Sequence, residues 1–522
     1  MPLPPNGTEW PPKRLRPIHT AMELWDAWWV GDPEGLEAAY GTERPRVRPA
    51  QLAGGVTGTL ARFFWGKPRL GTAVRTRVHV PIATDICQAS ADLIWSQAPE
   101  VRVDDEPTQA RLDDLIDDNA LRSFAKGCEA GAAHGGHFLR VTWDESVQPD
   151  GPFITVVYAD NADPEFRWGR LVAVTFWTVV HEEGGDVWRH LERHELENGV
   201  GVIRHGLFHG DRTNLGQRVP LTENPATAGL ADALEADGET ITTGSDGLAV
   251  VYVPNQDSQR RWRKDPAGKD LGRSDLDAIE GLMDSLDEAM SSWMRDVRLG
   301  KARLLLSQNA LSGNGLGEGA SFDVDQELFT ELNSPPSSAA NASTIVQAEQ
   351  FAIRHEEHKA TTDELVEAIL RTAGYSPSTF GRGGDGTMRT AREVSMDQQR
   401  SLLTRDRKLR ILRPVLAELL EKLLAVDAAL FGSAVKVQRP AVDFPDGVQE
   451  SMLELAQTAQ ALRVAEAAST ETLVRMTHPE WDDKEVLAEA GRIMGERDLA
   501  RPALPDPTDP TLVDGADPTE QS

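Results

Sequence analysis

Cysteine, long apolar runs and basic charge are all scarce in this sequence. Its 522 residues include two cysteines, Cys87 and Cys128, too few for a disulfide framework and typical of a reducing compartment. Both lie in helical text, so we expect buried, unpaired side chains. No apolar run approaches the roughly 18 to 20 residues that cross a bilayer, and residues 1–5 lack the regions of a signal peptide. We therefore expect no membrane partner.

Lysine and arginine are outnumbered by acidic residues. The chain has 54 Lys and Arg against 83 Asp and Glu, a formal net charge of -29. Gripping nucleic acid requires a surplus of basic side chains, so ordinary nucleic-acid binding is not predicted. The acidity fits solubility alone, or a surface that sits near DNA without adhering to it. Composition does not separate these two interpretations.

Complete catalytic motifs are also missing. A glycine-rich run comprises Gly381, Arg382, Gly383, Gly384, Asp385, Gly386 and Thr387. It has no lysine where a phosphate-binding loop needs Gly-Lys-Ser/Thr. His355 and His358 are three residues apart, whereas a metalloprotease helix spaces its two histidines by four. No Gly-x-Ser-x-Gly elbow or Cys-x-x-Cys pair occurs, so we predict no enzyme, cofactor, catalytic residue or metal ligand.

One group of histidines leaves an alternative open. It comprises His181, His190, His194, His205 and His209. If this segment forms strands, His190 and His194 point to the same face, and neighbours on the adjacent strand could complete a zinc site. A metal-dependent hydrolase is therefore an alternative function. Exposed polar residues on a two-sided sheet explain the same pattern.

The glycine-rich run lies between two predicted helices. Apolar residues at helical spacing predict a helix over 355–373, ended by Gly374 as its C-cap. A much longer helix follows, because a near-heptad leucine seam is formed by Leu402, Leu409, Leu412, Leu416, Leu419 and Leu423. Pro414 predicts a kink or restart in that helix. A loop with so many glycines does not hold one conformation by itself, so we expect a moving part.

Helical and irregular text opens the chain. Residues 1–17 are proline-rich and predict an irregular arm, after which Thr20 and Glu23 form a capping box for a short helix. A strong helix is expected to start at Ser274, with Asp275 in its first turn. Further helices are predicted over 81–94, 108–116, 121–133, 448–467, 470–477 and 484–497.

The middle of the chain reads as β-structure. Alternating β-branched and aromatic residues over 138–253 predict an antiparallel meander. Glycine pairs at 184–185 and Asn198-Gly199 supply its turns, and the acidic stretch 222–246 is expected to be a surface excursion. Residues 501–522 alternate Pro, Asp and Thr, which predicts a disordered acidic tail.

A locally basic run surrounds the glycine-rich loop and continues into the long helix. It comprises Arg382, Arg389, Arg392, Arg400, Arg405, Arg407, Lys408, Arg410 and Arg413. One interpretation is a solvated helix face paired with acidic residues elsewhere. The other is contact with a polyanion or ion pairing between subunits, for which Arg382, Arg389 and Arg392 are the candidates.

Four passages, in this order, resemble the portal proteins of tailed bacteriophages, of the long-tailed type that infects actinobacteria. The first is Trp-Asp-Ala-Trp-Trp-Val-Gly-Asp at 25–32, and the second is His-Val-Pro-Ile-Ala-Thr-Asp-Ile at 79–86, continuing to Trp95. The third is Gly-Arg-Ser-Asp-Leu at 272–276, and the fourth begins with His-Pro-Glu-Trp-Asp-Asp at 478–483. The resemblance covers about residues 20–500, and its strength lies in the ordered set.

The resemblance implies an α+β, mostly α-helical portal fold with named parts. In chain order these would be an N-terminal arm (1–19), a wing (20–273, with the meander 138–253), a first stem helix (274–298), a clip (299–354) and a second stem helix (355–373). The segment 374–444 would contain the tunnel loop, at about 381–388, and the long wing helix. A crown (445–500) and the tail (501–522) would follow.

The resemblance also implies a function without catalysis. Such a protein would form a ring of twelve subunits at one capsid vertex of the virion, after assembly in the host bacterial cytoplasm. Double-stranded DNA would pass through the ring without sequence specificity during packaging and ejection. The partners would be the terminase large subunit, a head–tail adaptor, and the major capsid and scaffolding proteins. A helical scaffolding or adaptor protein is a further alternative, although it explains the strand-rich middle poorly.

The charge of the chain fits a channel for DNA. Twelve copies would carry 12 × -29 = -348, and acidic walls repel phosphate and lower friction on a sliding duplex. Screening limits this repulsion to roughly 8 Å at physiological salt, so only walls close to the DNA would act. The candidate channel-lining residues are Glu280, Asp284, Glu364 and Glu367.

Overall fold

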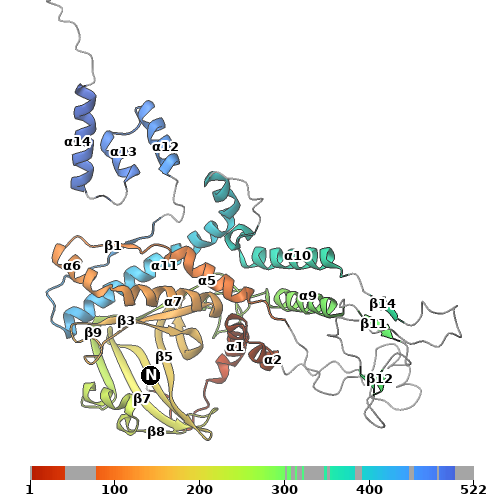
Figure 1. Ribbon diagram of the computed structural model, residues 1–522. Helices are drawn as coiled ribbons and strands as arrows, with labels where there is room; N and C mark the ends of the chain where they lie inside the picture. The colour runs from red at the N-terminus through yellow and green to blue at the C-terminus, as the bar shows by residue number, and fades with distance from the viewer. Residues whose placement is uncertain are drawn as a thin grey trace, which may run out of the picture. The chain divides into compact units, whose positions relative to one another are not determined.

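The computed structural model of the chain (Figure 1) describes residues 3–40, 78–299, 303–306, 312–313, 320–321, 346–349, 353–382, 391–445, 452–478, 481 and 483–499. The chain divides into two compact units, the first comprising Met1–Thr387 with Met396–Gly447 and the second Met388–Ser395 with Val448–Ser522. About half of the chain is helical and 21% lies in antiparallel sheet, so the predicted α+β class is confirmed. No described helix is both long and apolar enough to span a bilayer.

The N-terminal part of the first unit is more ordered than the sequence suggests. It contains η1 (Lys13–Leu15), α1 (Arg16–Val30) and α2 (Pro33–Tyr40). The predicted capping box is wrong: Thr20 and Glu23 lie inside α1, because Pro17 suits its first turn, where no backbone N–H is needed. Trp25 and Trp28 lie on its buried face.

The predicted arm is irregular over residues 3–12, as expected, and it packs against the larger sheet. Leu3 and Trp10 are buried together with side chains of the larger sheet. Trp10 meets Trp177 edge-on, with ring centroids 5.2 Å apart, and Glu9 forms a β-bridge with Asn214. Two large apolar side chains among the prolines therefore anchor this segment.

Three helices follow, and a side-chain cap fixes the start of two of them. They are α5 (Ile82–Trp95), α6 (Glu106–Leu115) and α7 (Asp118–His134). All three were predicted, with boundaries shifted by one to three residues. Asp105 accepts a hydrogen bond from Thr108 N, and Asp117 accepts one from Ala120 N, which is why α6 and α7 begin before their apolar periodicity does.

The predicted single meander is two antiparallel sheets. In the smaller sheet, β2 (Gly136–Thr142) lies between β3 (Phe153–Tyr158) and β10 (Val250–Pro254). The larger sheet has the order β4 (Ala162–Arg167), β5 (Arg170–Glu183), β6 (Asp186–Glu197), β7 (Val200–Gly210) and β8 (Gln217–Val219). The predicted turns are confirmed, since Asn198 and Gly199 both have positive φ, as a tight hairpin requires.

The acidic stretch 222–246 is only partly a surface excursion. Its short helical pieces are η3 (Leu221–Glu223), α8 (Pro225–Ala228) and η4 (Gly229–Ala233). Another short helix, η2 (Ala159–Asn161), lies outside this stretch and precedes the larger sheet. The last part of the stretch is strand β9 (Thr240–Asp246), which pairs with β7. A separate small pair joins β1 (Glu100–Arg102) to β15 (Ala441–Asp443).

Two helices then form an antiparallel hairpin, α9 (Glu280–Leu299) and α10 (His355–Ala373). Figure 1 shows them side by side, and they share one apolar core cluster. Beyond them, β11 (Arg303–Leu306) pairs with β14 (Val346–Glu349), and β12 (Ser312–Gly313) pairs with β13 (Ala320–Ser321). The predicted bounds of α10 are confirmed, and its C-cap Gly374 has φ +101°.

The predicted start of the first hairpin helix at Ser274 is wrong by six residues, since α9 begins at Glu280. Residues 275–279 form turns, and Ala278 has a φ of +74°, which a right-handed helix does not allow. Ser274 donates a hydrogen bond to Ala133 O, 2.5 Å away. The Ser-Asp pair therefore makes tertiary contacts instead of opening the helix.

A short segment leads from the hairpin to the longest helix. It contains η7 (Pro377–Phe380), and the helix is α11 (Ala391–Leu430). The predicted leucine seam is confirmed for Leu409, Leu412, Leu416, Leu419 and Leu423, which are all buried. α11 runs through Pro414 without a restart, because Leu side chains on both sides of the proline pack into one core cluster.

The second unit is helical, as predicted. It contains α12 (Met452–Val464), α13 (Thr470–Thr477) and α14 (Asp483–Leu499). Ser469 caps α13 by accepting a hydrogen bond from Thr472 N. Val474, Val486 and Ala490 are the buried apolar side chains between α13 and α14.

Candidate functional site at the base of the helix hairpin

A buried carboxylate lies just before α9. Asp275 is 2% exposed, and its oxygens accept hydrogen bonds from Lys408 Nζ at 2.5 Å and Tyr375 OH at 2.7 Å. Two amides also donate to it, Asn255 Nδ2 at 2.8 Å and Gln256 Nε2 at 2.6 Å. A buried charge needs this degree of compensation, so Asp275 is the centre of a built polar site.

The partners of Asp275 come from elements that are far apart in the sequence. Lys408 lies in the middle of α11, and its Nζ also donates to Ser90 Oγ of α5 at 2.5 Å. Tyr375 follows the C-cap of α10. We call Ser90, Asp275, Tyr375 and Lys408 the junction, because they tie both ends of the hairpin base to α5 and α11.

The electrostatics of the junction hold its charges in place. Burial alone would raise the pKa of Asp275, but the Lys408 ammonium and the hydrogen bonds outweigh it and lower that pKa. Burial, followed by the neighbouring Asp275 charge, raises the pKa of the Tyr375 hydroxyl well above its ordinary value. Tyr375 therefore stays protonated and serves as a hydrogen-bond donor.

The segment that enters the glycine-rich loop is fixed to α11. Thr404 Oγ1 donates to Gly374 O at 2.7 Å, and Ser401 Oγ accepts from Ser376 N at 2.9 Å. Thr379 and Ser401 hydroxyls are 2.7 Å apart. The chain is therefore held just before η7 and within it, ahead of the loop.

Most of the predicted tunnel loop lies outside the described residues, namely Gly383, Gly384, Asp385, Gly386 and Thr387. Gly381 is described, with a φ of +70° that ends η7. Arg382 Nη1 forms an ion pair with Asp363 Oδ1 of α10 at 2.9 Å. Arg389 and the side chain of Arg392 also fall outside the described part.

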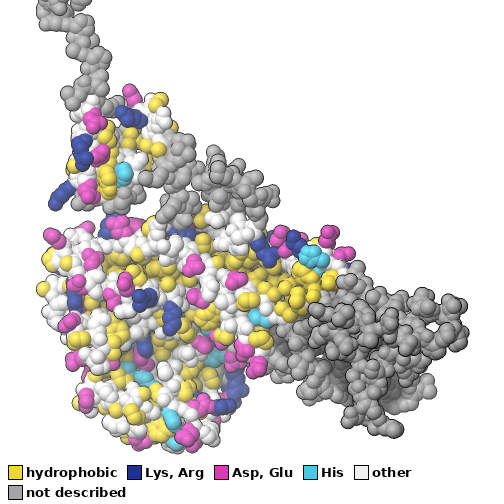
Figure 2. All heavy atoms as spheres, viewed as in Figure 1, with side chains coloured by type: hydrophobic (Ala, Val, Ile, Leu, Met, Phe, Trp, Pro, Cys, Tyr) yellow, Lys and Arg dark blue, Asp and Glu magenta, His cyan; other side chains and the backbone are white. Residues whose placement is uncertain are grey.

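The four candidate channel-lining carboxylates are in different surroundings. Glu280 accepts hydrogen bonds from Trp25 Nε1 and Arg261 Nη1, both at 3.0 Å. Asp284 is partly buried and interacts with a neighbouring group. Glu364 and Glu367 are exposed on α10, and Figure 2 shows acidic side chains on the outer surface of that helix. The structure thus brings together only the last two as a free acidic face.

The two histidines at the start of α10 do not form a metal motif. His358 Nε2 lies 2.9 Å from Asp296 Oδ2, and its ring stacks on Trp293 of α9 with centroids 6.0 Å apart. His355 also packs against Trp293. These contacts hold the two helices of the hairpin together near the end remote from the junction.

The five histidines of the larger sheet separate into different environments. His181 is half exposed beside Glu183, and His209 stacks on Trp188. His190 Nε2 and His205 Nδ1 are 3.1 Å apart, and His194 Nε2 lies 2.6 Å from Glu192 Oε1. Nowhere in the described part of the chain do three or more His, Cys, Asp or Glu side chains meet in an arrangement that could hold a metal ion.

Glu192 explains why polar groups gather there. Its carboxylate pairs with Arg140 of the smaller sheet as well as with His194. Burial would raise its pKa, but Arg140 and His194 outweigh burial and hold that pKa well below its ordinary value. Burial lowers the pKa of His205 to about 4. The cluster is an ion pair that joins the two sheets, with three histidines around it.

The junction was missed at the sequence level. Asp275 was interpreted as a helix-opening residue, and Lys408 as one of a basic run. One signal was available: Lys408 precedes Leu412 and Leu416 by four and eight residues, which places it on the buried face of α11. No comparable signal marks Tyr375, which pairs with Asp275 from a position 100 residues away in the chain.

Comparison with known proteins identifies the family. The family model described as "Phage portal protein, SPP1 Gp6-like" matches residues 71–499, which include α5, both sheets, the hairpin and α11. No curated protein matches the chain significantly. The family implies an oligomeric ring in a phage head and a component of the virion capsid. The chain belongs to the phage portal protein family, of the SPP1 Gp6-like type.

Proposed function

We propose that this chain is the subunit of a portal ring at one capsid vertex, through which double-stranded DNA enters during packaging and leaves at ejection. The ring would have twelve subunits, would perform no catalysis, and would dock the terminase large subunit and the head–tail adaptor. It would assemble in the host cytoplasm with the major capsid and scaffolding proteins. The observation that carries the proposal is the family match over residues 71–499.

The arrangement of the helices supports this proposal. In it, α9 and α10 are the two stem helices, residues 299–354 form the clip, and α11 is the long wing helix. The glycine-rich tunnel loop would then follow a segment that hydrogen bonds fix to α11. Residues 445–500 would form the crown. A loop that acts as a moving constriction would need such a fixed base.

The channel wall is assigned to the exposed face of α10. Glu364 and Glu367 are exposed there, so their charges are available to repel phosphate groups. Glu280 is left out, because Trp25 and Arg261 already occupy its carboxylate. The repulsion acts over roughly 8 Å at physiological salt, which is sufficient only if α10 lies close to the duplex.

Electron microscopy of the purified full-length protein tests the proposal. We expect uniform rings with a central channel wide enough for a DNA duplex. Class averages would also give the number of subunits directly. A homogeneous monomer or an open chain of subunits under all assembly conditions would rule the proposal out.

No second function is proposed. The hydrolase alternative rested on the five histidines, whose side chains divide among an ion-pair cluster, a tryptophan stack and an exposed edge. The scaffolding or adaptor alternative has no observation in its favour, whereas the family match spans both sheets and the hairpin.

A further inference from the structure

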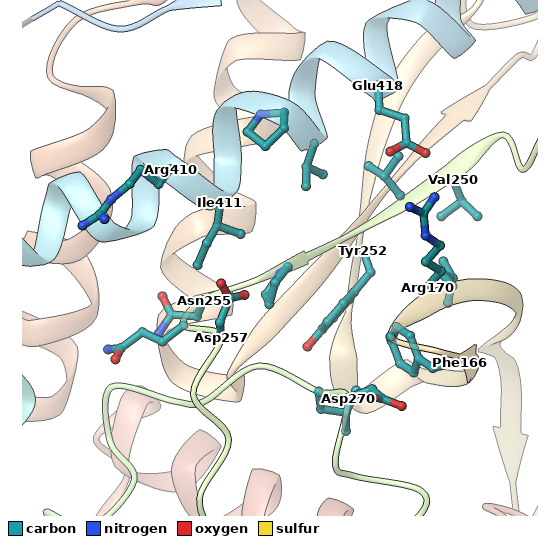
Figure 3. Close-up of a pocket in the computed structure, with 18 of the residues that line it drawn as sticks. Phe166, Arg170, Val250, Tyr252, Asn255, Asp257, Asp270, Arg410, Ile411 and Glu418 are labelled. Carbon is teal, nitrogen blue, oxygen red and sulfur yellow. The ribbon is translucent and has the colours of Figure 1, made fainter. Parts of the chain in front are cut away.

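A basic groove lies between α11, β10 and the segment 254–273. It is a cavity of about 1120 Å³, and the described side chains that line it include eight Lys or Arg and three Asp or Glu. Figure 3 shows Ile411 of α11 facing Asn255 and Asp257 across the groove. The chain has a net charge of -29, so the sign of the charge in this groove is opposite to that of the chain as a whole.

Five of the eight basic side chains of the groove have partners: Lys269 and Lys422 pair with acidic residues, and Arg273, Arg410 and Arg439 donate hydrogen bonds. Arg170, Arg260 and Arg407 are exposed, and none of them forms an ion pair within the described part of the chain. Arg273 Nε is buried without a hydrogen-bond partner among the described residues. Burial, and after it the nearby Arg260 charge, lowers the pKa of Arg273. These cations repel one another and would be stabilised by an acidic partner.

The floor of the groove favours a protein partner over DNA. Phe166, Leu271, Ile411 and Val415 are among its lining residues. Apolar side chains gain free energy only against other apolar groups, and a phosphate backbone offers none to such a floor. A surface that combines a basic rim with an apolar floor therefore fits a polypeptide with acidic and apolar side chains.

The same chain carries an exposed acidic surface around α6. We call it the acidic corner; it comprises Asp104, Glu106, Asp113, Asp114, Asp117 and Asp118, all exposed. No salt bridge to any of the six occurs within the described residues. Figure 2 shows acidic side chains gathered over α6. Its charge is opposite to that of the groove.

The groove and the acidic corner lie on opposite sides of α11. Arg407, Ile411 and Glu418 line the groove, at spacings that place them on one face of the helix. Asp427 lies about 160° around the helix from Ile411, at 3.6 residues per turn. Asp427 pairs with Arg111 of α6, with Nη2 and Oδ1 2.7 Å apart. One chain therefore cannot place its own α6 in its own groove.

We propose that the basic groove of one subunit receives the acidic corner of the next copy of the chain. Because the two surfaces differ and lie on opposite sides, the contact is head-to-tail, and a closed ring follows if the rotation between copies closes. The inference rests on the proposed portal ring and names the surfaces that hold neighbouring subunits together.

Two charge-reversed variants test this pairing. One is Arg407→Glu/Arg410→Glu in the groove, and the other is Asp113→Lys/Asp114→Lys at the end of α6, where lysine suits the helix dipole. Each alone should raise the concentration needed for ring formation by about 100-fold or more, the effect of opposing like charges in an interface. An equimolar mixture should form rings again, because the introduced glutamates of one variant then face the introduced lysines of the other. Mass photometry and sedimentation give the assembled mass.

The matched control is Arg413→Glu, which changes the same charge at an exposed position of α11 outside the groove. It should assemble as the unmodified chain does. Rings from either double variant alone, or no rescue in the mixture, would overturn the inference. If the groove variant forms intact rings that retain duplex DNA more weakly, the groove would be assigned to DNA instead. If it forms intact rings and behaves as a chain lacking residues 501–522 does, the groove would be assigned to the acidic tail. Failure of the unmodified chain to form rings would refute the proposed function itself, a separate result.

Discussion

The ammonium of Lys408 and the carboxylate of Asp275 form a buried ion pair in the first unit, and losing either group should strongly affect stability. Both side chains are at most 5% exposed, and Ser90, Tyr375 and two amides complete their hydrogen bonds. A buried pair of this kind need not add net stability, but losing one partner leaves a charge with no counter-ion. Its effect is therefore best seen by removing one side or both.

Lys408→Met should lower the free energy of unfolding of the first unit by about 3 to 5 kcal/mol, since it leaves Asp275 buried without its cation. Urea denaturation followed by tryptophan fluorescence measures this loss. The double variant Asp275→Asn/Lys408→Met removes both charges and should be less destabilised than the single variant. An equal or greater loss in the double variant would show that the pair acts only through packing.

His137 should make stability depend on pH. Burial lowers its pKa to about 3, against an ordinary value of about 6.5. Because the folded pKa is lower, the unfolded chain binds the proton first, so stability is complete above about pH 6.5 and falls as the pH drops towards 3. At pH 4 this side chain alone should remove about 3 kcal/mol.

The check is the variant His137→Leu, which cannot titrate. Its free energy of unfolding should fall less steeply between pH 6.5 and 4, by about one proton on the linkage slope. Added Cβ atoms at Gly127 and Gly131 would lie 2.6 and 2.7 Å from the His137 ring, so those glycines make room for it. Identical slopes in the two proteins would mean that the pKa of His137 is the same in the folded and unfolded states.

At the scale of elements, periodicity predicted what local chemistry controls. α10 and its Gly374 cap, the hairpin turns and the leucine seam of α11 were predicted, because each depends on residues close in sequence. The start of α9 was not predicted, because Asp275 pairs with Lys408, which lies 133 residues away in the sequence. The division into two sheets was not predicted either, because the alternation of residues along a strand does not show which strand pairs with β2.

The acidic face of α10 should matter for DNA passage and not for folding. The change Glu364→Lys/Glu367→Lys replaces two exposed carboxylates with cations that would bind phosphate. We expect normal rings but slower DNA packaging, with a deficit that shrinks at higher salt as the charges are screened.

Glu288→Lys is the control for α10, since it makes the same charge change at an exposed position of α9. Packaging rates in particles carrying either variant provide the measurement. Equal rates for the α10 variant and the unmodified protein would remove α10 from the channel wall.

Deleting Gly383 and Gly384 should leave ring assembly intact and impair packaging. The packing contacts near the loop belong to Gly374, Ser376 and Thr379, which hydrogen bond to α11. The glycines supply freedom of backbone conformation instead. Ring counts by microscopy and DNA content of particles separate the two effects; loss of rings would make the loop a structural element.

On the scale of the whole molecule, the chain consists of two compact units with separate apolar clusters. A chain that ends at Gly447 should therefore keep the first unit folded, because both large core clusters lie within residues before that point. Hydrogen exchange should show the same protection of α5, α7 and β2 with and without the remainder. General loss of protection would show that the helical second unit is needed for folding of the first.

The buried pair of the junction also limits how related phage chains can diverge. A lone substitution at position 275 or 408 leaves a charge with no counter-ion inside the protein. A paired substitution avoids this unpaired buried charge only if both changes occur together, or if a change in a neighbouring residue first supplies a counter-charge. Among diverged portal sequences, the two positions should therefore covary, both charged or both neutral, although they are 133 positions apart in the sequence.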